Sequence, residues 1–197
     1  PAGAIISRMA LSERKGEEKP VMKRLLDLDI PIIYKVHGSG TFEGGDFMWI
    51  DEETAVTGQS IKTNYEGFRQ VRNILEMQGV ELLKASVPQG FRIKGRGYGH
   101  IDGVLSILDD DLAAVYPEGL PYRFLEYLAD KDFDLIEIPK EERSHLGINL
   151  LTLGPRKVIA VEGNEETKDL LEEEGVEVIE VELEELIKGG GGPRCTV

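Results

Sequence analysis

The residues best suited to chemistry lie at the end of the chain, around its single cysteine. Cys195 follows a run of four glycines at residues 189–192, with one proline and one arginine between them. A thiolate is a strong nucleophile, and glycine allows backbone conformations that let a ligand approach closely. A lone cysteine is also commonly a small unreactive side chain, and a glycine-rich terminus is commonly a mobile tail. A catalytic interpretation therefore requires a base for the sulfur and carboxylates for a substrate elsewhere in the chain.

A second glycine-rich stretch, residues 95–102, ends with a histidine and an aspartate two positions apart. On a strand, His100 and Asp102 would point to the same face. A histidine beside a carboxylate is suited to acid–base catalysis near neutral pH. The alternative is a histidine that is hydrogen-bonded in the core. This stretch supplies a candidate base for Cys195.

A third glycine-rich stretch, residues 40–46, has carboxylates on both sides of a glycine pair. Glu43 and Asp46 are either turn residues or a pair of carboxylates that hold a cation. A metal site formed by Cys195, His100 and the acidic residues is a further alternative. No two of these residues have the close spacing typical of metal ligands. We therefore predict no metal and expect no cofactor.

The elements that must position these residues repeat along the chain. A strand, a second strand, a helix and a third strand follow one another three times. The repeats are spaced by about 57 and about 45 residues, which is typical of an array of similar units. In the first repeat, the strand, strand, helix and strand are predicted at residues 46–50, 54–58, 65–78 and 80–83. In the second repeat they are predicted at 103–108, 112–116, 121–130 and 133–138. In the third repeat they are predicted at 148–153, 157–161, 164–174 and 176–181.

The N-terminal segment fits the same order without its first strand, with a strand at 3–9, a helix at 17–28 and a strand at 30–36. Residues 189–197 would begin a further unit. We therefore expect one α/β-propeller domain over residues 1–197, a pseudo-fivefold ring of ββαβ modules whose N-terminal module is missing or incomplete. An open ring leaves uncovered edges, so we expect a homo-oligomer or a longer native polypeptide. The alternative is an ordinary α/β domain with accidentally similar units.

Composition narrows the class of partner. Of the 197 residues, 41% are hydrophobic and 30% are charged, which is enough for one globular core. The net charge of −14 argues against a nucleic-acid or anionic-membrane surface and suits a small cationic ligand, although acidic surfaces commonly serve solubility alone. A single cysteine excludes an internal disulfide framework. With neither a leader nor an apolar run of about 18 residues, we expect a cytoplasmic protein.

Four motifs in order resemble the guanidino-modifying enzymes of the pentein fold, namely the arginine deiminases, dimethylarginine dimethylaminohydrolases and amidinotransferases. The motifs are Glu-Gly-Gly-Asp at 43–46, Gly-x-Ser-x-Lys-Thr-Asn at 58–64, His-Ile-Asp at 100–102 and the glycine run before Cys195. The resemblance extends over essentially the whole chain. It implies a five-bladed α/β propeller around a central site, which agrees with the repeat.

The resemblance also implies roles for individual residues. Cys195 is similar to the nucleophile that attacks the guanidinium carbon, and His100 to the general acid and base. Asp46 and Asp102 are similar to the carboxylates that hold the guanidinium nitrogens. A thiolate attacks best when a nearby cation, such as protonated histidine or the substrate itself, lowers the thiol pKa.

Other positions bear on which member of the family this chain resembles. Ile61 stands where arginine deiminases have an acidic residue, and Lys62 stands where the hydrolases usually have an arginine that receives the substrate carboxylate. The stretch around Asn64 is similar to the amidinotransferases, whereas the stretch from Glu43 is similar to the hydrolases. Lys62, Asn64 and Glu43 are therefore included among the expected substrate-binding residues.

The expected function is hydrolysis of a C–N bond in an arginine-like guanidino compound, through a covalent thiouronium intermediate on Cys195. An amidinotransferase that passes the amidino group from arginine to an amine is the first alternative. A propeller fragment that binds without catalysis is the second alternative.

Overall fold

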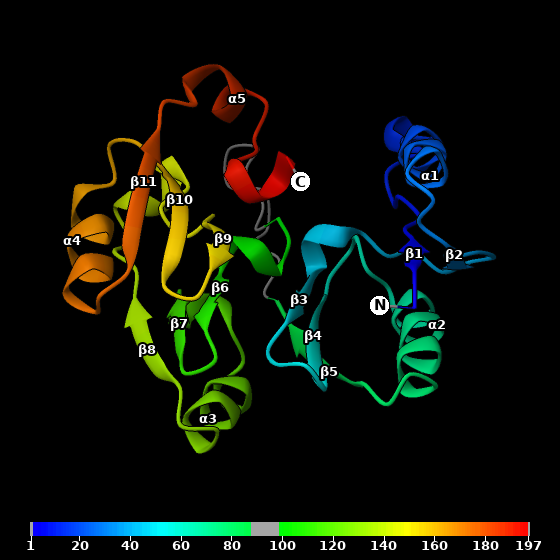
Figure 1. Ribbon diagram of the computed structural model, residues 1–197, viewed down its shortest axis with the longest axis horizontal. Helices are drawn as coiled ribbons and strands as arrows, with labels where there is room; N and C mark the ends of the chain where they lie inside the picture. The colour runs from blue at the N-terminus through cyan, green and yellow to red at the C-terminus, as the bar shows by residue number, and fades with distance from the viewer. Residues whose placement is uncertain (1, 88–98, 197) are drawn as a thin grey trace. The chain divides into compact units, whose positions relative to one another are not determined.

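The computed structural model describes residues 2–87 and 99–196 of the 197-residue chain. The chain divides into two compact units, residues 1–91 and residues 92–197, which are called here the N-terminal and the C-terminal unit. Each unit contains two small sheets with helices between strands (Figure 1).

The N-terminal unit contains a two-stranded and a three-stranded sheet. In the first sheet, β1 and β2 are parallel and α1 lies between them in the chain. In the second sheet, β4 is the central strand, antiparallel to β3 and parallel to β5. The elements are β1 Ala4–Ile6, α1 Glu18–Asp27, β2 Ile32–Lys35, β3 Phe47–Trp49, β4 Thr54–Gln59, α2 Tyr65–Glu76 and β5 Glu81–Ser86.

The C-terminal unit contains two three-stranded sheets of the same construction. In each, a central strand pairs antiparallel with the strand before it and parallel with the strand after the helix. The elements are β6 Leu105–Asp109, β7 Leu112–Val115, α3 Tyr122–Asp130, β8 Asp134–Glu137, β9 Leu151–Gly154, β10 Lys157–Val161, α4 Glu165–Glu173, β11 Glu177–Val181 and α5 Glu184–Lys188. The predicted threefold ββαβ repeat is confirmed.

Helix α2 shows how a module is assembled. Asn64 caps its N-terminus, and its Oδ1 accepts hydrogen bonds from the backbone N–H of Gly67 at 2.8 Å and of Thr41 at 3.1 Å. The helix buries one apolar face against the sheet, because apolar residues recur there at helical spacing. The buried cluster consists of Val36, Phe42, Ala55, Phe68, Val71, Leu75 and Leu82.

Gly67 is required for the close approach of α2 to the preceding loop. A Cβ at this position would lie 1.9 Å from the carbonyl oxygen of Thr41, which is backbone and cannot turn away. We expect Gly67→Ala to lower the free energy of unfolding by about 1–3 kcal/mol. Urea denaturation measures this loss. Gly154→Ala is the matched control, since nothing lies within 4 Å of its added Cβ; equal midpoints for the two variants would contradict the expectation.

The first strand of each repeated module begins later than predicted. Strands were expected at 46–50, 103–108 and 148–153, but β3, β6 and β9 begin at residues 47, 105 and 151. Tight turns precede them, in which a backbone N–H bonds the carbonyl three residues earlier. These bonds run from Asp46 N to Glu43 O at 3.0 Å, from Gly103 N to His100 O at 3.1 Å and from Asn149 N to Leu146 O at 2.9 Å.

The same turn closes the end of the chain, where Cys195 N donates to Gly192 O at 3.0 Å. A further unit was predicted to begin within residues 189–197, where the described residues form a 3-10 turn, Pro193–Thr196, after the short helix α5; the further unit stays a prediction. Glycine permits such a turn directly after a helix because it adds no side-chain bulk to the reversal of the chain. The missing first module, and the single domain over residues 1–197, stay predictions.

Candidate active site

Within the C-terminal unit, the turn that carries Cys195 lies against the turn that carries Asp102. The Sγ atom of Cys195 is 3.6 Å from Asp102 Oδ2 and 3.5 Å from Asn149 Oδ1, so the thiol donates its proton toward an oxygen. The structure therefore brings together Cys195, Asp102 and Asn149, which lie in three different turns.

Asp102 is a buried carboxylate, only 4% exposed. Burial raises its pKa because the charged form loses water, whereas the positive charges of His100 and Arg194 and the hydrogen bonds of Cys195 and Asn149 act in the opposite direction. A carboxylate can bind a planar cation such as a guanidinium through paired charge-assisted hydrogen bonds.

His100 and Asp102 were predicted to share one face of a strand, and this local expectation is wrong. Residues Ile101–Gly103 form a 3-10 turn that His100 precedes in extended conformation. A three-residue turn gives no periodic signal in the sequence, which is why a strand was expected. The two residues still interact, since the charge of His100 lowers the pKa of Asp102.

The pKa of the Cys195 thiol is raised. Partial burial of the sulfur is the main cause and the negative charge of Asp102 is the second, while a hydrogen bond with the Gly192 backbone acts in the opposite direction. The resemblance implied that a nearby cation, either protonated histidine or the substrate itself, lowers this pKa. In the protein without a ligand, this environment therefore favours the protonated form of the thiol.

This raised pKa predicts a particular pH profile for alkylation. The rate of reaction of Cys195 with iodoacetamide should follow its thiolate, with a midpoint above that of the same thiol in the urea-unfolded chain. Cys195 is the only cysteine, so mass spectrometry reports on it alone. Because the folded state holds this proton more tightly, stability should fall as pH rises past the ordinary thiol pKa of about 8.5. A folded-state midpoint at or below the unfolded one would contradict this.

Asn149 was not among the predicted site residues. It is 2% exposed, and its Nδ2 donates to the backbone oxygen of Asp102 at 3.3 Å. A neutral amide carries no charge signal, but its position just before β9 corresponds to that of Asp46 before β3. The repeat could therefore have indicated it.

Asp46, Ser60 and Lys62 lie together in the N-terminal unit. Asp46 is fully buried, and Ser60 Oγ donates to its Oδ2 at 3.0 Å. The same Ser60 oxygen accepts the backbone N–H of Lys62 at 3.0 Å, which fixes the loop that carries this lysine. Within residues 2–87 and 99–196, no ion pair of the half-buried Lys62 ammonium is seen. The predicted roles of Asp46 and Lys62 in substrate binding stay predictions.

Glu43 and Asn64 have contacts of a structural kind. Both oxygens of the buried Glu43 carboxylate are engaged, one by the backbone N–H of Ala10 at 3.1 Å and one by Arg14 Nη1 at 3.3 Å. The Asn64 amide caps α2 and donates to the Ser39 carbonyl at 2.8 Å. Direct contact of either residue with a substrate stays a prediction, and these bonds favour a role in holding loops.

The described residues provide neither a metal site nor a helix that could span a membrane. In the part of the chain that the structure describes, no group of three or more His, Cys, Asp or Glu side chains could hold a metal ion. Among the same residues, no helix has the length and apolar character needed to cross a bilayer.

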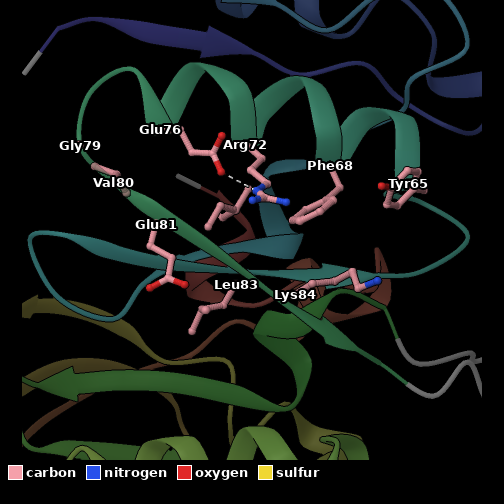
Figure 2. Close-up of a pocket in the computed structure, with 10 residues that line it drawn as sticks. Tyr65, Phe68, Arg72, Glu76, Gly79, Val80, Glu81, Leu83 and Lys84 are labelled. Atoms are coloured by element: carbon pink, nitrogen blue, oxygen red, sulfur yellow. Dashed lines mark hydrogen bonds and ion pairs between the residues drawn. The ribbon is translucent and has the colours of Figure 1, made fainter.

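Figure 2 shows an open groove within the N-terminal unit, between α2 and β5. Its volume is about 710 Å³, and Lys84 lies over the rings of Tyr65 and Phe68 on its wall, at 5.8 and 6.0 Å from their centroids. Arg72 and Glu76 form an ion pair of 2.7 Å beside them. None of the predicted site residues lines this groove, so it is separate from the candidate active site.

Solved structures define the class of fold. A dimethylarginine dimethylaminohydrolase from Pseudomonas aeruginosa, a cysteine-to-serine mutant complexed with citrulline, is similar with a TM-score of 0.78 and 27% identity, over 97% of this chain and 68% of that one. The amidinotransferase SxtG from Microseira wollei shares the fold, with a TM-score of 0.79 and 19% identity over 97% and 64% of the two chains. The predicted fold class, an α/β propeller of ββαβ modules, is confirmed.

The family follows from the sequence comparison. A family model described as N,N dimethylarginine dimethylhydrolase, eukaryotic, matches residues 2–197. The chain belongs to the dimethylarginine dimethylaminohydrolase family, and the resemblance to guanidino-modifying enzymes is confirmed.

Curated relatives are longer than this chain. The Bacillus subtilis protein YkgA is 30% identical and an Aeropyrum pernix protein is 33% identical, each over 98% of this chain. An arginine deiminase from Bacillus cytotoxicus is 27% identical over 98% of this chain. The comparisons cover 63%, 65% and 57% of these relatives, so this chain spans less than two thirds of their length.

Proposed function

We propose that this chain acts on the guanidino group of an arginine-like compound, as a hydrolase that uses Cys195 as its nucleophile. The observation that carries the proposal is the contact between the Cys195 thiol and the buried Asp102 carboxylate, 3.6 Å from Sγ to Oδ2. A nucleophile beside a carboxylate fits a cationic, planar electrophile, because the carboxylate holds the guanidinium nitrogens while the sulfur faces the carbon. Membership of the dimethylarginine dimethylaminohydrolase family supports this chemistry.

The protonated resting thiol suggests how the substrate itself starts the reaction. The charge of Asp102 is one cause of the raised pKa of Cys195. A guanidinium bound to Asp102 would neutralise that charge and place a cation beside the sulfur, and both changes lower the thiol pKa. The thiolate would then form mainly when substrate is bound.

The proposed reaction has two stages. In the first, the thiolate of Cys195 forms a bond to the guanidinium carbon, and one C–N bond breaks as His100 protonates the leaving amine. In the second, water adds to the thiouronium carbon and gives a proton to His100, and the C–S bond breaks to release the thiolate. The citrulline in the Pseudomonas aeruginosa complex is the type of product that these two reaction stages give from arginine.

Asp46 and Lys62 are assigned to the substrate from their motif positions. Asp46 provides a second carboxylate for the guanidinium, and Lys62 provides a positive charge for a substrate carboxylate. A lysine can pair with a carboxylate but lacks the two-pronged geometry of arginine, so looser discrimination among substrate carboxylates is expected.

The test is to incubate the chain with arginine, N,N-dimethylarginine and agmatine, with and without glycine as an amine acceptor. Acid quenching followed by intact mass identifies any adduct on Cys195. A hydrolase gives an adduct that retains the substrate skeleton, with release of ammonia or dimethylamine. An amidinotransferase gives an adduct of the amidino group alone, ornithine, and a modified acceptor. A folded chain that forms neither product nor adduct with any of these compounds would overturn the proposal.

A further inference from the structure

We propose that Asn149 is a positioning residue of this site, which holds the Cys195 turn against the Asp102 turn and sets the orientation of the thiol. The inference rests on the proposed function, because it assigns Asn149 to the nucleophile and to the carboxylate of that reaction. Asn149 forms no covalent bond in the reaction and acts through Cys195 and Asp102, which it contacts.

The amide of Asn149 joins the two turns. Its Nδ2 donates to the backbone oxygen of Asp102 at 3.3 Å, and its Oδ1 lies 3.5 Å from the Cys195 sulfur. The backbone of Asn149 is also fixed, because its N–H donates to the Leu146 carbonyl at 2.9 Å. With both ends of the amide engaged and the residue buried, the side chain cannot rotate without breaking a contact.

Gly192 shows that the turn is shaped around this amide. A Cβ at position 192 would lie 2.5 Å from Asn149 Oδ1 and 3.0 Å from its Cγ. The carbonyl of Gly192 accepts the N–H of Cys195 and so closes the turn that presents the sulfur. The absence of a side chain at Gly192 therefore lets Asn149 lie directly against the turn of the nucleophile.

The neutrality of Asn149 also matters for the charge around the sulfur. Asp102 faces the sulfur, and its charge raises the pKa of Cys195, while Asn149 presents its neutral amide oxygen to the thiol. His100 and Arg194 are the positive groups that act on Asp102. A carboxylate at position 149 would add a second negative charge beside the sulfur and make the thiol harder to ionise.

The test compares Asn149→Asp, which keeps the shape, with Asn149→Ala, by the pH profile of iodoacetamide alkylation of Cys195. Asn149→Asp should move the thiol midpoint upward by about one unit, which makes alkylation about tenfold slower near neutral pH. Asn149→Ala removes an acceptor of the thiol proton, so it should move the midpoint downward by a smaller amount and make alkylation faster. Asn164→Ala is the matched control, since Asn164 is equally buried at 3% exposure but bonds the carbonyls of His145 and Val161. It should lower stability and leave the alkylation profile unchanged.

A second measurement uses the contact with Gly192. Gly192→Ala should destabilise the native chain, and should destabilise the Asn149→Ala background by less, because the clashing amide is gone. Unchanged alkylation profiles in both Asn149 variants, or additive effects of the two alanine substitutions, would overturn the inference. Neither measurement requires turnover, so its failure is distinct from a failure of the proposed function, which the product analysis tests.

Discussion

Replacing Cys195 with serine should abolish conversion of guanidino compounds, with a loss of about a thousandfold or more. A guanidinium carbon is a poor electrophile, and a serine hydroxyl ionises far less readily than a thiol in the same place. The chain has no second cysteine that could substitute for it. Serine has nearly the shape of cysteine and its hydroxyl can donate to the same oxygens, so the free energy of unfolding should change by no more than about 0.5 kcal/mol.

The measurement is product formation by mass spectrometry together with urea unfolding of each variant. Ser144→Ala is the control, because it removes an exposed hydroxyl elsewhere in the C-terminal unit. It should retain both activity and stability. Citrulline or ornithine formation at an undiminished rate by Cys195→Ser would disprove the covalent mechanism.

Asp102→Asn should have two opposite effects. The rate of substrate conversion should fall by a factor of about 10²–10³, because the carboxylate that neutralises the guanidinium charge is lost. Alkylation of Cys195 by neutral iodoacetamide should become faster near neutral pH, because the charge of Asp102 contributes to the raised pKa of the thiol. Unfolding would also speed alkylation, because it exposes the thiol, so urea denaturation must show that Asp102→Asn is folded under the assay conditions.

A pair of alkylating reagents sharpens the second prediction. Chloroacetamidine is a cation and chloroacetamide is its neutral counterpart, so the ratio of their rates reports on attraction of a guanidinium-like charge. Asp102→Asn should lower this ratio, whereas Asp130→Asn, which removes an exposed carboxylate on α3, should not. An unchanged ratio, with conversion also unchanged, would show that Asp102 does not bind the cation.

The repeated module was predictable because its strands and helices carry periodic patterns of apolar residues and end at glycine or turn residues. The turns that present His100 and Cys195 were not predictable, and a turn at Glu43 was only one of two alternatives, since each is a 3-10 turn of three or four residues and has no period. For this reason the strands were predicted to begin too early. Helix α5, Glu184–Lys188, has only five residues and buries none of them, so it also lacked a signal.

The site was predictable only in part, for a related reason. Cys195, His100 and Asp102 stand out through charge, nucleophilicity and flanking glycines. Asn149 has none of these properties, and its importance depends on two contacts that form only on folding. The raised pKa of Cys195 likewise results from burial and from a carboxylate 93 positions away in the sequence, which no local pattern encodes.

In the recurring turns, the hydrogen bond that closes the turn does not involve the reactive side chain. Each is closed from main chain to main chain, from Asp46 to Glu43, Gly103 to His100, Asn149 to Leu146 and Cys195 to Gly192. A backbone bond of this kind forms with almost any side chain in place, so an ancestor could exchange one functional group at such a turn without losing the module. Diversification of chemistry within such a lineage would then proceed by replacement at equivalent turn positions while the sheets remain unchanged.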